Sequence, residues 1–444
     1  MPDTTIKGLS VRDIRFPTSR AFVGSDATNK DPDYSAAYLQ LECTDGSVGH
    51  GLIFTIGRGN ELCCAAIEAM RHLVVGRSLA GITESLGAFC DTLRSDSQLR
   101  WLGPEKGIIH MAGGCIINAV WDLWARRERM PVWELACRLA PEHFVASIDL
   151  RYLGDVLPQG EALEMIHRNV APKDERIAYL KAHGYPAYTT SAGWLGYGDD
   201  KLRALAREAL EQGFGSVKLK VGQCLEDDLR RIRILRETVG EDVRIMIDAN
   251  QIWEVDEAIH WVEQLRDYRP AFIEEPTSPD DVHGHLKIKR ALGDIGVATG
   301  EHCQNRIVFK QFIEMDALDV VQVDACRMGG LSEMLSVGLI AAKFGKPVWP
   351  HAGGVGLCEY VQHYSMIDYV LLSGRLDDRA TEYVDHLHEH FEDPCVVRGG
   401  CYVAPSQPGF SIRMREASLD QYEFPNGHVW RKLAAGAEPR LHPI

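Results

Sequence analysis

The chain has 444 residues, of which 45% are apolar and 25% charged, and its formal net charge is −15. This length exceeds what one ordinary hydrophobic core organises, so we expect two domains in a soluble globular protein. The acidic balance argues against nucleic acid or an anionic membrane as a partner. An anionic substrate would therefore have to be attracted locally, by a metal ion or by lysines.

Cysteine usage and the start of the chain indicate the compartment. The twelve cysteines are scattered without a CxxC pair, and residues 1–10 lack the apolar segment of a signal peptide. We therefore expect reduced thiols and a cytoplasmic protein. No apolar run approaches the roughly 20 residues that span a bilayer, so no membrane partner is expected.

The first part of the chain predicts a small antiparallel sheet. Residues 5–17 alternate like a strand, and residues 34–56 suggest two more strands around the turn 44–47. Between them, residues 24–33 form a polar loop, and such a loop is either a binding lid or a mobile surface segment.

Residues 59–140 have helical patterning, over 61–75, 84–93 and 108–127, and residues 141–184 resemble a linker with one or two helices. We therefore expect an α+β domain with its linker over residues 1–180.

A regular series follows. A first strand over residues 186–191 and its loop over 192–198 precede six short apolar runs, each ending in a residue able to do chemistry. These end residues are Lys220, Asp248, Glu274, Glu301, Asp324 and His351, and successive numbers differ by 28, 26, 27, 23 and 27. The intervening segments, such as 225–239 and 331–344, have helical spacing.

Repeated strand–helix units of this size predict a parallel α/β fold. We expect a modified (β/α) TIM barrel over residues 181–390, with the first domain as its cap. Residues 391–444 contain strand-like pieces at 395–397 and 410–413, and this segment is expected to pack back on the capping domain. The carboxyl ends of barrel strands converge on one face, where active sites form.

Three of the strand ends carry carboxylates: Asp248, Glu274 and Glu301. Three acids in one cavity raise one another's pKa unless a cation is present, and an all-oxygen set favours Mg²⁺, with Mn²⁺ as a substitute. Strand-end salt bridges are the alternative interpretation. Alternation alone does not choose between Glu274 and its neighbour Glu275.

Lys218 and Lys220 are two residues apart on one strand, so both face the same side. A lysine acts as a base only when neutral, and a second ammonium, a metal ion and burial all lower its pKa. The alternative is that the two lysines simply pair with the acids.

Asp324 and His351 end consecutive strands and are therefore expected to be neighbours at the rim. A carboxylate fixes the tautomer of a histidine ring and stabilises its protonated form, which suits an acid or base near neutral pH. Together these parts predict that a metal ion holds a substrate carboxylate and stabilises an enediolate. A lysine would remove the adjacent proton, and a histidine would act from the other side.

The motifs VKLKVG, IDANQIW, FIEEP, ATGEH, VQVDACRMGG and WPHAGG resemble the mandelate racemase subgroup of the enolase superfamily. The muconate cycloisomerase branch, which carries a lysine in the region of Asp324, fits less well. The resemblance implies the following roles: metal ligands Asp248, Glu274 and Glu301, base Lys220, tuning and binding residue Lys218, substrate contact Asn250, and the opposite acid–base pair His351 and Asp324.

Within this subgroup the chain is similar to the L-fuconate dehydratase family, in the long loop that contains Gly24 and ends at Tyr34, and in the stretch HAGGVGLCEYVQH. This resemblance implies that Gly24 and Tyr34 lie at the substrate. It also implies a glutamate at the eighth strand end, either Glu382 or its rival Glu359.

The implied reaction converts L-fuconate to 2-keto-3-deoxy-L-fuconate, in a protein that self-associates. A racemase or epimerase with the same lysine and histidine, a dehydratase of another sugar acid, and a non-catalytic sugar-acid-binding barrel are the alternatives.

Overall fold

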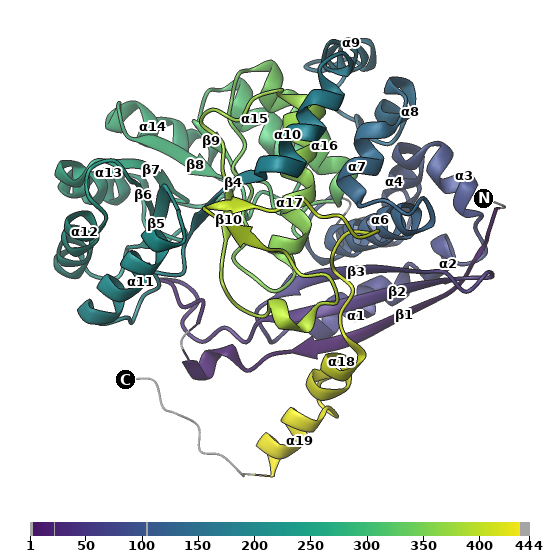
Figure 1. The fold of residues 1–444 in the computed structure, drawn as a ribbon, viewed down its shortest axis with the longest axis horizontal. Coiled ribbons are helices and arrows are strands. Elements are labelled where there is room, and N and C mark those ends of the chain that lie inside the picture. The colour runs from purple at the N-terminus through teal and green to yellow at the C-terminus, as the bar shows by residue number, and fades with distance from the viewer. Residues whose placement is uncertain (1–2, 22, 104, 436–444) are drawn as a thin grey trace.

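The computed structural model describes residues 3–21, 23–103 and 105–435 (Figure 1). The chain begins with a three-stranded antiparallel sheet in the order β1-β2-β3. Its strands are β1 (Ile6–Arg15), β2 (Ser35–Cys43) and β3 (Val48–Thr55). The predicted turn at residues 44–47 joins β2 and β3, so this hairpin is confirmed.

Helices follow the sheet in sequence. They are α1 (Asn60–Ala69), α2 (Arg71–Val74), α3 (Leu79–Glu84), α4 (Leu86–Arg94), α5 (Leu99–Leu102), α6 (Gly107–Arg127), α7 (Val132–Arg138) and α8 (Pro141–Ala146). Two further helices, α9 (Gln159–Val170) and α10 (Lys173–His183), lead to the barrel. Residues 141–184 thus hold three helices, and the expectation of one or two was too low because the charged segments here disguise the apolar faces of α9 and α10.

Helix α6 lies between the sheet and the barrel. A Cβ on Gly49 or Gly51 of β3 would come 2.5 Å from a backbone carbonyl oxygen of α6, so these glycines let the helix approach the strand closely. A Cβ on Gly114 of α6 would likewise meet the carbonyl oxygen of Met328, in a barrel loop, at 2.3 Å. These contacts fix the capping sheet over the loop that follows Asp324.

Helix α6 is also long and apolar enough to cross a membrane, contrary to the expectation that no segment approached that length, but 89% of the relevant window is buried inside the protein. Its hydrophobicity is accounted for by packing on two sides, as in the core helix of a soluble protein.

Six parallel strands run in sequence order and form most of the barrel: β4 (Tyr185–Thr189), β5 (Ser216–Lys220), β6 (Arg244–Asp248), β7 (Pro270–Glu274), β8 (Gly296–Thr299) and β9 (Val320–Val321). A single parallel bridge from Val321 to Val348 adds the seventh position. Strand β10 (Thr381–Tyr383) pairs in parallel with β4 and closes the barrel. The predicted TIM-type barrel with an α+β cap is therefore confirmed.

Seven helices separate the barrel positions along the chain. They are α11 (Asp199–Glu211), α12 (Leu225–Val239), α13 (Val255–Leu265), α14 (Val282–Leu292), α15 (Arg306–Glu314), α16 (Leu331–Lys343) and α17 (Leu357–Ile367). After α17 come a π-helical turn η3 (Asp368–Leu372) and then β10. Figure 1 shows α11–α14 along the outer side of β5–β8.

No covering helix directly follows β10 within the described residues. The chain instead forms η4 (His388–His390), β11 (Val397–Arg398), β12 (Cys401–Tyr402), α18 (Glu416–Tyr422) and α19 (His428–Ala434). Strand β12 pairs antiparallel with β4, while Arg12 of β1 forms ion pairs with Asp420 and Glu423 of the terminal segment. Figure 1 shows α18 beside β1. The domain boundaries at residues 180 and 390 stay a prediction.

The predicted strand at residues 410–413 is wrong. This segment has no ladder partner, and only isolated bridges flank it, from Gly409 to Pro131 and from Met414 to Phe391. Its apolar side chains Phe410 and Ile412 are buried against the capping domain and barrel, which explains the strand-like pattern without a strand.

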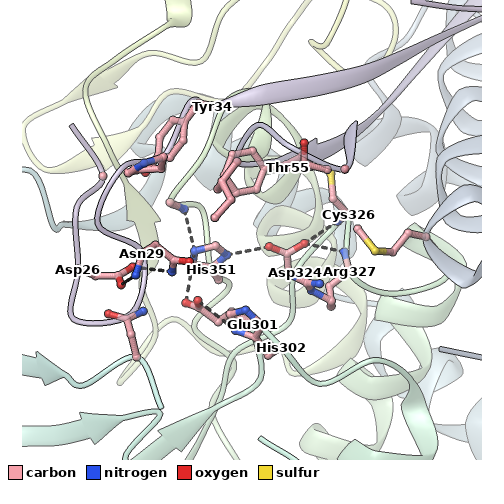
Figure 2. Close-up of a pocket in the computed structure, with 18 of the residues that line it drawn as sticks. Asp26, Asn29, Tyr34, Thr55, Glu301, His302, Asp324, Cys326, Arg327 and His351 are labelled. Atoms are coloured by element: carbon pink, nitrogen blue, oxygen red, sulfur yellow. Dashed lines mark hydrogen bonds and ion pairs between the residues drawn. The ribbon is translucent and has the colours of Figure 1, made fainter. Parts of the chain in front are cut away.

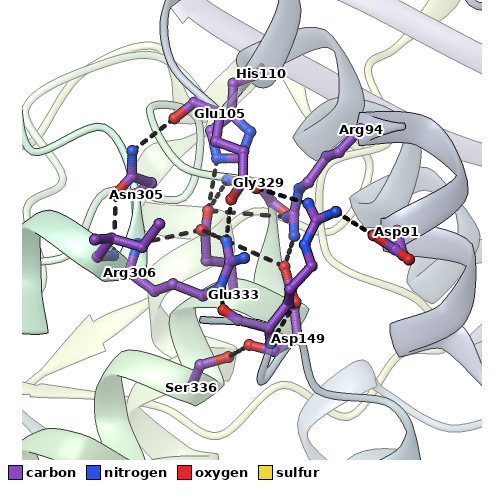
Figure 3. A network of polar contacts seen from close by, with 12 residues as sticks. Asp91, Arg94, Glu105, His110, Asp149, Asn305, Arg306, Gly329, Glu333 and Ser336 are labelled. Atoms are coloured by element: carbon purple, nitrogen blue, oxygen red, sulfur yellow. Dashed lines mark hydrogen bonds and ion pairs between the residues drawn. The ribbon is translucent and has the colours of Figure 1, made fainter. Parts of the chain in front are cut away.

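A buried polar network joins the capping domain to the barrel (Figure 3). Arg306 Nη1 of α15 lies 2.6 Å from Glu105 Oε2 and 2.7 Å from Glu333 Oε1. His110 of α6 lies 2.7 Å from the other oxygen of Glu333, and Arg94 of α4 pairs with Asp149. The contacts of His110 with Glu333 and of Glu105 with Arg306 cross between the two parts of the chain and form when these parts are docked.

Candidate active site

Three carboxylates meet at the carboxyl end of the barrel. Asp248 and Glu274 are the last residues of β6 and β7 and stand opposite each other in the ladder, and Glu301 follows β8 by two residues. All three are buried, and one oxygen of each lies within 4.8 Å of the others. The spacing of the strands therefore produces the close contact that the sequence predicted.

The donor set fits a hard divalent cation. Burial is the largest effect on Glu274 and, together with the negative charge of Asp248, it raises the pKa of Glu274 well above its usual range. Glu301 Oε2 is buried and has no hydrogen-bond partner. An ion bound by these oxygens would relieve both penalties, and carboxylate oxygens are the ligands that Mg²⁺ prefers.

Glu275 makes different contacts from its neighbour Glu274. Its Oε1 lies 3.0 Å from His302 Nδ1, and its Oε2 accepts a hydrogen bond from Gln251 Nε2 at 2.8 Å. Glu275 groups with Glu301 and His302, whereas only Glu274 groups with both Asp248 and Glu301, which distinguishes the two neighbours that alternation left open.

Lys218 and Lys220 both reach the cluster, in different ways. Lys218 Nζ lies 2.9 Å from both oxygens of Glu274 and 2.9 Å from Glu382 Oε1. Lys220 Nζ lies 2.6 Å from Asp248 Oδ2. Both lysines therefore pair with acids.

Burial alone would lower the pKa of Lys220, but the adjacent carboxylate of Asp248 raises it above its ordinary value. The charge of Lys218 does lower the pKa of Lys220, as expected, but the negative charges of Asp248 and Glu301 outweigh it. A cation shared by the three carboxylates would oppose this raising.

Lys218 is also not a lining residue of the cavity. Its side chain is fully buried beneath the carboxylates, so direct contact with a substrate is not supported by its position. Its contacts fit the other part of its predicted role, which is to tune the site.

His351 and Asp324 form the predicted pair. His351 Nδ1 lies 2.7 Å from Asp324 Oδ2, whose partner oxygen accepts hydrogen bonds from the backbone N–H groups of Cys326 and Arg327 at 2.7 and 2.8 Å. His351 Nε2 lies 3.4 Å from Glu301 Oε2. Figure 2 shows the ring between Asp324 and Glu301.

The environment of His351 favours its protonated form. Burial alone lowers its pKa, but the charge of Glu301 and the hydrogen bond to Asp324 raise the pKa to about 10. Lys220 approaches the cluster at Asp248 and His351 at Glu301, so an acid–base group stands at each side of the carboxylates.

Glu382 on β10 lies beside this machinery. Its Oε2 accepts a hydrogen bond from the backbone N–H of Ala352 at 2.9 Å and lies 3.9 Å from His351 Nε2. Its rival Glu359 bonds to His388 at 2.7 Å and does not line the cavity. Position therefore favours Glu382 as the eighth-strand glutamate.

A cavity of about 300 Å³ opens above these groups (Figure 2). Its lining includes the predicted residues Lys220, Asn250, Glu301, Asp324, His351, Glu382, Gly24 and Tyr34. The side-chain oxygen of Asn250 is buried without a hydrogen-bond partner, so it is available to a ligand. Asp248 and Glu274 lie deeper, behind the lining.

The loop at residues 24–33 forms one wall of this cavity. Thr28 Oγ1 donates to the backbone oxygen of Asn250 at 2.6 Å, which joins the loop to the barrel rim. A Cβ on Gly24, whose φ is +81°, would come 2.1 Å from the Tyr34 hydroxyl, so only glycine fits there. This loop is therefore built into the site rather than being free at the surface.

The cavity has further lining residues that the sequence analysis did not select: Asp26, Asn29, Phe54, Arg58, Trp194, Cys326 and Arg327. Asp26 and Asn29 lie in the loop 24–33, for which a binding lid was one of two interpretations, and Trp194 lies in the predicted loop after the first barrel strand. Arg58 carried no signal, because only the docking of the cap brings it to the barrel.

The closed barrel, its α+β cap and the acid–base groups at its strand ends define the enolase-like class of α/β proteins. The chain matches the family described as "Enolase C-terminal domain-like" over residues 201–418. Residues 18–136 match "Mandelate racemase / muconate lactonizing enzyme, N-terminal domain". The chain thus belongs to the enolase superfamily, in the mandelate racemase subgroup, as its motifs indicated.

Similar proteins extend over nearly the whole chain. L-galactonate dehydratase of Hypocrea jecorina is 51% identical over 430 residues, which cover 96% of this chain and 95% of that protein. Human mitochondrial enolase superfamily member 1 is 48% identical over 437 residues, covering 98% and 99%. Its crystal structure has a TM-score of 0.96 over 97% of this chain and 99% of that chain.

Proposed function

We propose that this chain is a Mg²⁺-dependent dehydratase of six-carbon sugar acids. The observation that carries the proposal is that a lysine and a histidine–aspartate pair approach one carboxylate cluster from two sides, at the bottom of a cavity of about 300 Å³. The similarity to an L-galactonate dehydratase supports the same chemistry.

Asp248, Glu274 and Glu301 would hold the Mg²⁺, which when bound would neutralise negative charge on the substrate carboxylate. In its neutral form Lys220 removes the proton from C2. Protonated His351, oriented by Asp324, gives its proton to the 3-hydroxyl, which leaves as water when the C3–O bond breaks. The resulting enol tautomerises to a 2-keto-3-deoxy acid.

The substrate configuration we propose is that of L-galactonate. L-Fuconate is 6-deoxy-L-galactonate, so the two acids are identical from C1 to C5 and differ only by a methyl or hydroxymethyl group. We propose L-fuconate as the preferred member, converted to 2-keto-3-deoxy-L-fuconate. The name of the Hypocrea jecorina protein supports the shared configuration and leaves the choice at C6 to experiment.

A panel of sugar acids with Mg²⁺ tests this proposal, with 2-keto products detected as semicarbazones. We expect turnover of L-fuconate and L-galactonate, a higher kcat/KM for L-fuconate, and loss of turnover with EDTA that Mg²⁺ restores. Turnover confined to acids of other configurations would refute the substrate assignment while leaving the dehydratase chemistry intact.

Proton NMR in D₂O separates dehydration from racemisation or epimerisation, the second function available to the same residues. Dehydration consumes the substrate, whereas epimerisation only exchanges and inverts the C2 proton. If no metal-dependent reaction occurs with any acid, the chain is a binding protein rather than an enzyme. Mn²⁺ as a substitute, a cytoplasmic location and self-association stay predictions.

A further inference from the structure

A second group of metal-ligating side chains lies outside the active-site cavity. Cys358 in the first turn of α17, His388 at the start of η4, and Cys395 each offer one ligand atom, and these atoms lie within 4.8 Å of one another. Both cysteines are buried, and the His388 side chain is 16% exposed. The group therefore has a narrow route to solvent on the imidazole side.

The imidazole of His388 is held in a defined orientation. Its Nε2 lies 2.8 Å from the backbone oxygen of Val384, so this nitrogen carries a proton and donates it. The ring also stacks on Tyr383, with centroids 5.4 Å apart and planes at 9°. The other nitrogen, Nδ1, faces Cys395 Sγ at 3.5 Å. A metal-binding histidine has this pattern, with one nitrogen fixed by a carbonyl and the other directed at the ion.

The carboxylate of Glu359 lies beside His388. Glu359 Oε1 lies 2.7 Å from the same Nδ1 of His388, and Glu359 Oε2 is buried without a hydrogen-bond partner. A buried carboxylate oxygen without a partner carries a desolvation cost that needs an explanation. A cation bound by this carboxylate would offset that cost by compensating its charge.

We propose that Cys358, His388 and Cys395, with Glu359 as the fourth ligand, form a structural Zn²⁺ site. Sulfur, imidazole nitrogen and carboxylate oxygen are all ligands that zinc binds, and structural zinc has four of them, whereas Mg²⁺ requires oxygen ligands. The position of Cys358 at the N-terminus of α17 favours the thiolate that zinc binds.

The site lies where the barrel lacks a covering helix after β10. It would connect α17 to the segment that holds His388 and Cys395, just beyond Glu382. Cys358 Sγ contacts the backbone oxygen of Ala352 at 3.5 Å, and the N–H of Ala352 binds Glu382. With four protein ligands and no open position the ion has a structural role, holding the wall that carries Glu382.

Metal analysis of the full-length protein, purified with a reductant from zinc-supplemented medium, is the test. We expect about one zinc ion per chain that survives the brief EDTA treatment that removes Mg²⁺. Replacement of zinc by Co²⁺ should give the near-ultraviolet thiolate-to-cobalt absorption and the visible bands of a tetrahedral site. Because the Co²⁺ spectrum is recorded on the unaltered chain, it does not depend on any variant folding.

Variants locate the site. Cys358→Ser and Cys395→Ser should each reduce the thiolate absorption by about half and weaken zinc retention at least tenfold, because each removes one of two sulfur ligands. The control Cys224→Ser, at an exposed cysteine, should leave both unchanged. Asp248→Asn, in the carboxylate cluster, should retain the zinc.

Three results would overturn the proposal. One is a chain without zinc and without the Co²⁺ absorption. Another is zinc content that Cys358→Ser and Cys395→Ser leave intact. The last is a Cys358–Cys395 disulfide, found by mass spectrometry in protein purified under the same reducing conditions.

Discussion

Two pairs of glutamates illustrate how position decides the role of identical side chains. Glu274 and Glu275 are adjacent, yet the first meets Lys218 and the second His302. Glu382 and Glu359 both follow the WPHAGG motif, yet only Glu382 lines the cavity. The first pair is separated because β7 ends at Glu274 and Glu275 has a left-handed backbone with φ +43°. The second depends on which element closes the barrel.

At Lys220 and His351, a single substitution should stop the reaction without unfolding the protein. Lys220→Ala and His351→Asn should each lower kcat by about 10²–10⁴-fold, the usual contribution of a general acid or base. Steady-state kinetics with L-fuconate measure kcat, and circular dichroism shows whether each variant is folded. Lys287→Ala, at an exposed lysine of α14, is the control. A variant with more than a tenth of the original kcat would contradict the assigned role.

His363 in α17 gives the stability a pH dependence. Burial lowers its pKa to about 3, and its Nδ1 accepts a hydrogen bond from the backbone N–H of Trp133 at 3.2 Å. The unfolded chain protonates this ring below about pH 6.5 while the folded chain does not. The free energy of unfolding should therefore fall as the pH decreases from about 6.5 towards 3, by up to about 1.4 kcal/mol per pH unit.

Chemical denaturation of the unaltered chain and of His363→Gln, at pH 7 and pH 5, measures the contribution of His363 to the free energy of unfolding. The loss of stability between the two pH values should be about 2 kcal/mol smaller in the variant. His167→Gln, at a largely exposed histidine, should behave like the unaltered chain. An unchanged pH dependence in His363→Gln would show that the ring is not kept neutral.

At the scale of elements, the loop at residues 24–33 is the part of the cap that enters the site. Asp26 organises it by accepting hydrogen bonds from the backbone N–H groups of Thr28 and Asn29 at 2.8 and 2.5 Å. The backbone oxygen of Ser25 accepts a hydrogen bond from the N–H of Leu195, in the loop after β4. The cavity wall therefore depends on two loops from different domains holding each other.

Gly24→Ala should disturb this wall. The new Cβ would collide with the Tyr34 hydroxyl, and a displacement of about 1 Å at a site can cost 10²-fold in rate. We expect kcat/KM to fall at least tenfold while the melting temperature changes by a few degrees.

Gly46→Ala is the matched control, because Gly46 has a similar φ of +83° but nothing within 4 Å of a Cβ. It should share the backbone strain, about 1 kcal/mol, and keep its kcat/KM. Equal kinetic effects of the two substitutions would indicate that strain, and not the contact with Tyr34, is responsible.

For the whole molecule, the buried network around Arg306 makes the docking of cap and barrel specific (Figure 3). Arg306→Met would remove the cation that Glu333 and Glu105 share, and leave Glu333 only His110 and Arg94 and Glu105 only Arg151 as ion-pair partners. Removing one partner of a buried pair costs about 3–5 kcal/mol, so a large loss of stability against urea is expected.

Lys310→Met on the same helix removes a pair in which Asp155 is 65% exposed, and it should change stability little. Similar stability of the Arg306→Met and Lys310→Met variants would show that water replaces the lost contacts of Arg306.

The sequence by itself determined the barrel, its cap and the positions of the chemical groups along the strands. A strand and a helix require a fixed length of chain, so residues at a regular step, such as Asp248 and Glu274, must reach the same end of a parallel sheet. Local patterns also indicated the hairpin, through the turn at residues 44–47, and α6, through its helical spacing. They misjudged residues 410–413, because burial between two domains produces the same apolar pattern as a strand.

Only the tertiary structure decided which groups meet across long sequence distances. The pairing of Lys218 with Glu382, the entry of Asp26 and Arg58 into the cavity, and the grouping of Cys358 with Cys395 depend on barrel closure and domain docking. Those contacts follow from the packing of the whole chain, which local sequence patterns do not predict. Ionic pairing inside that packed site also kept the pKa of Lys220 high, against the expectation from adjacent like charges.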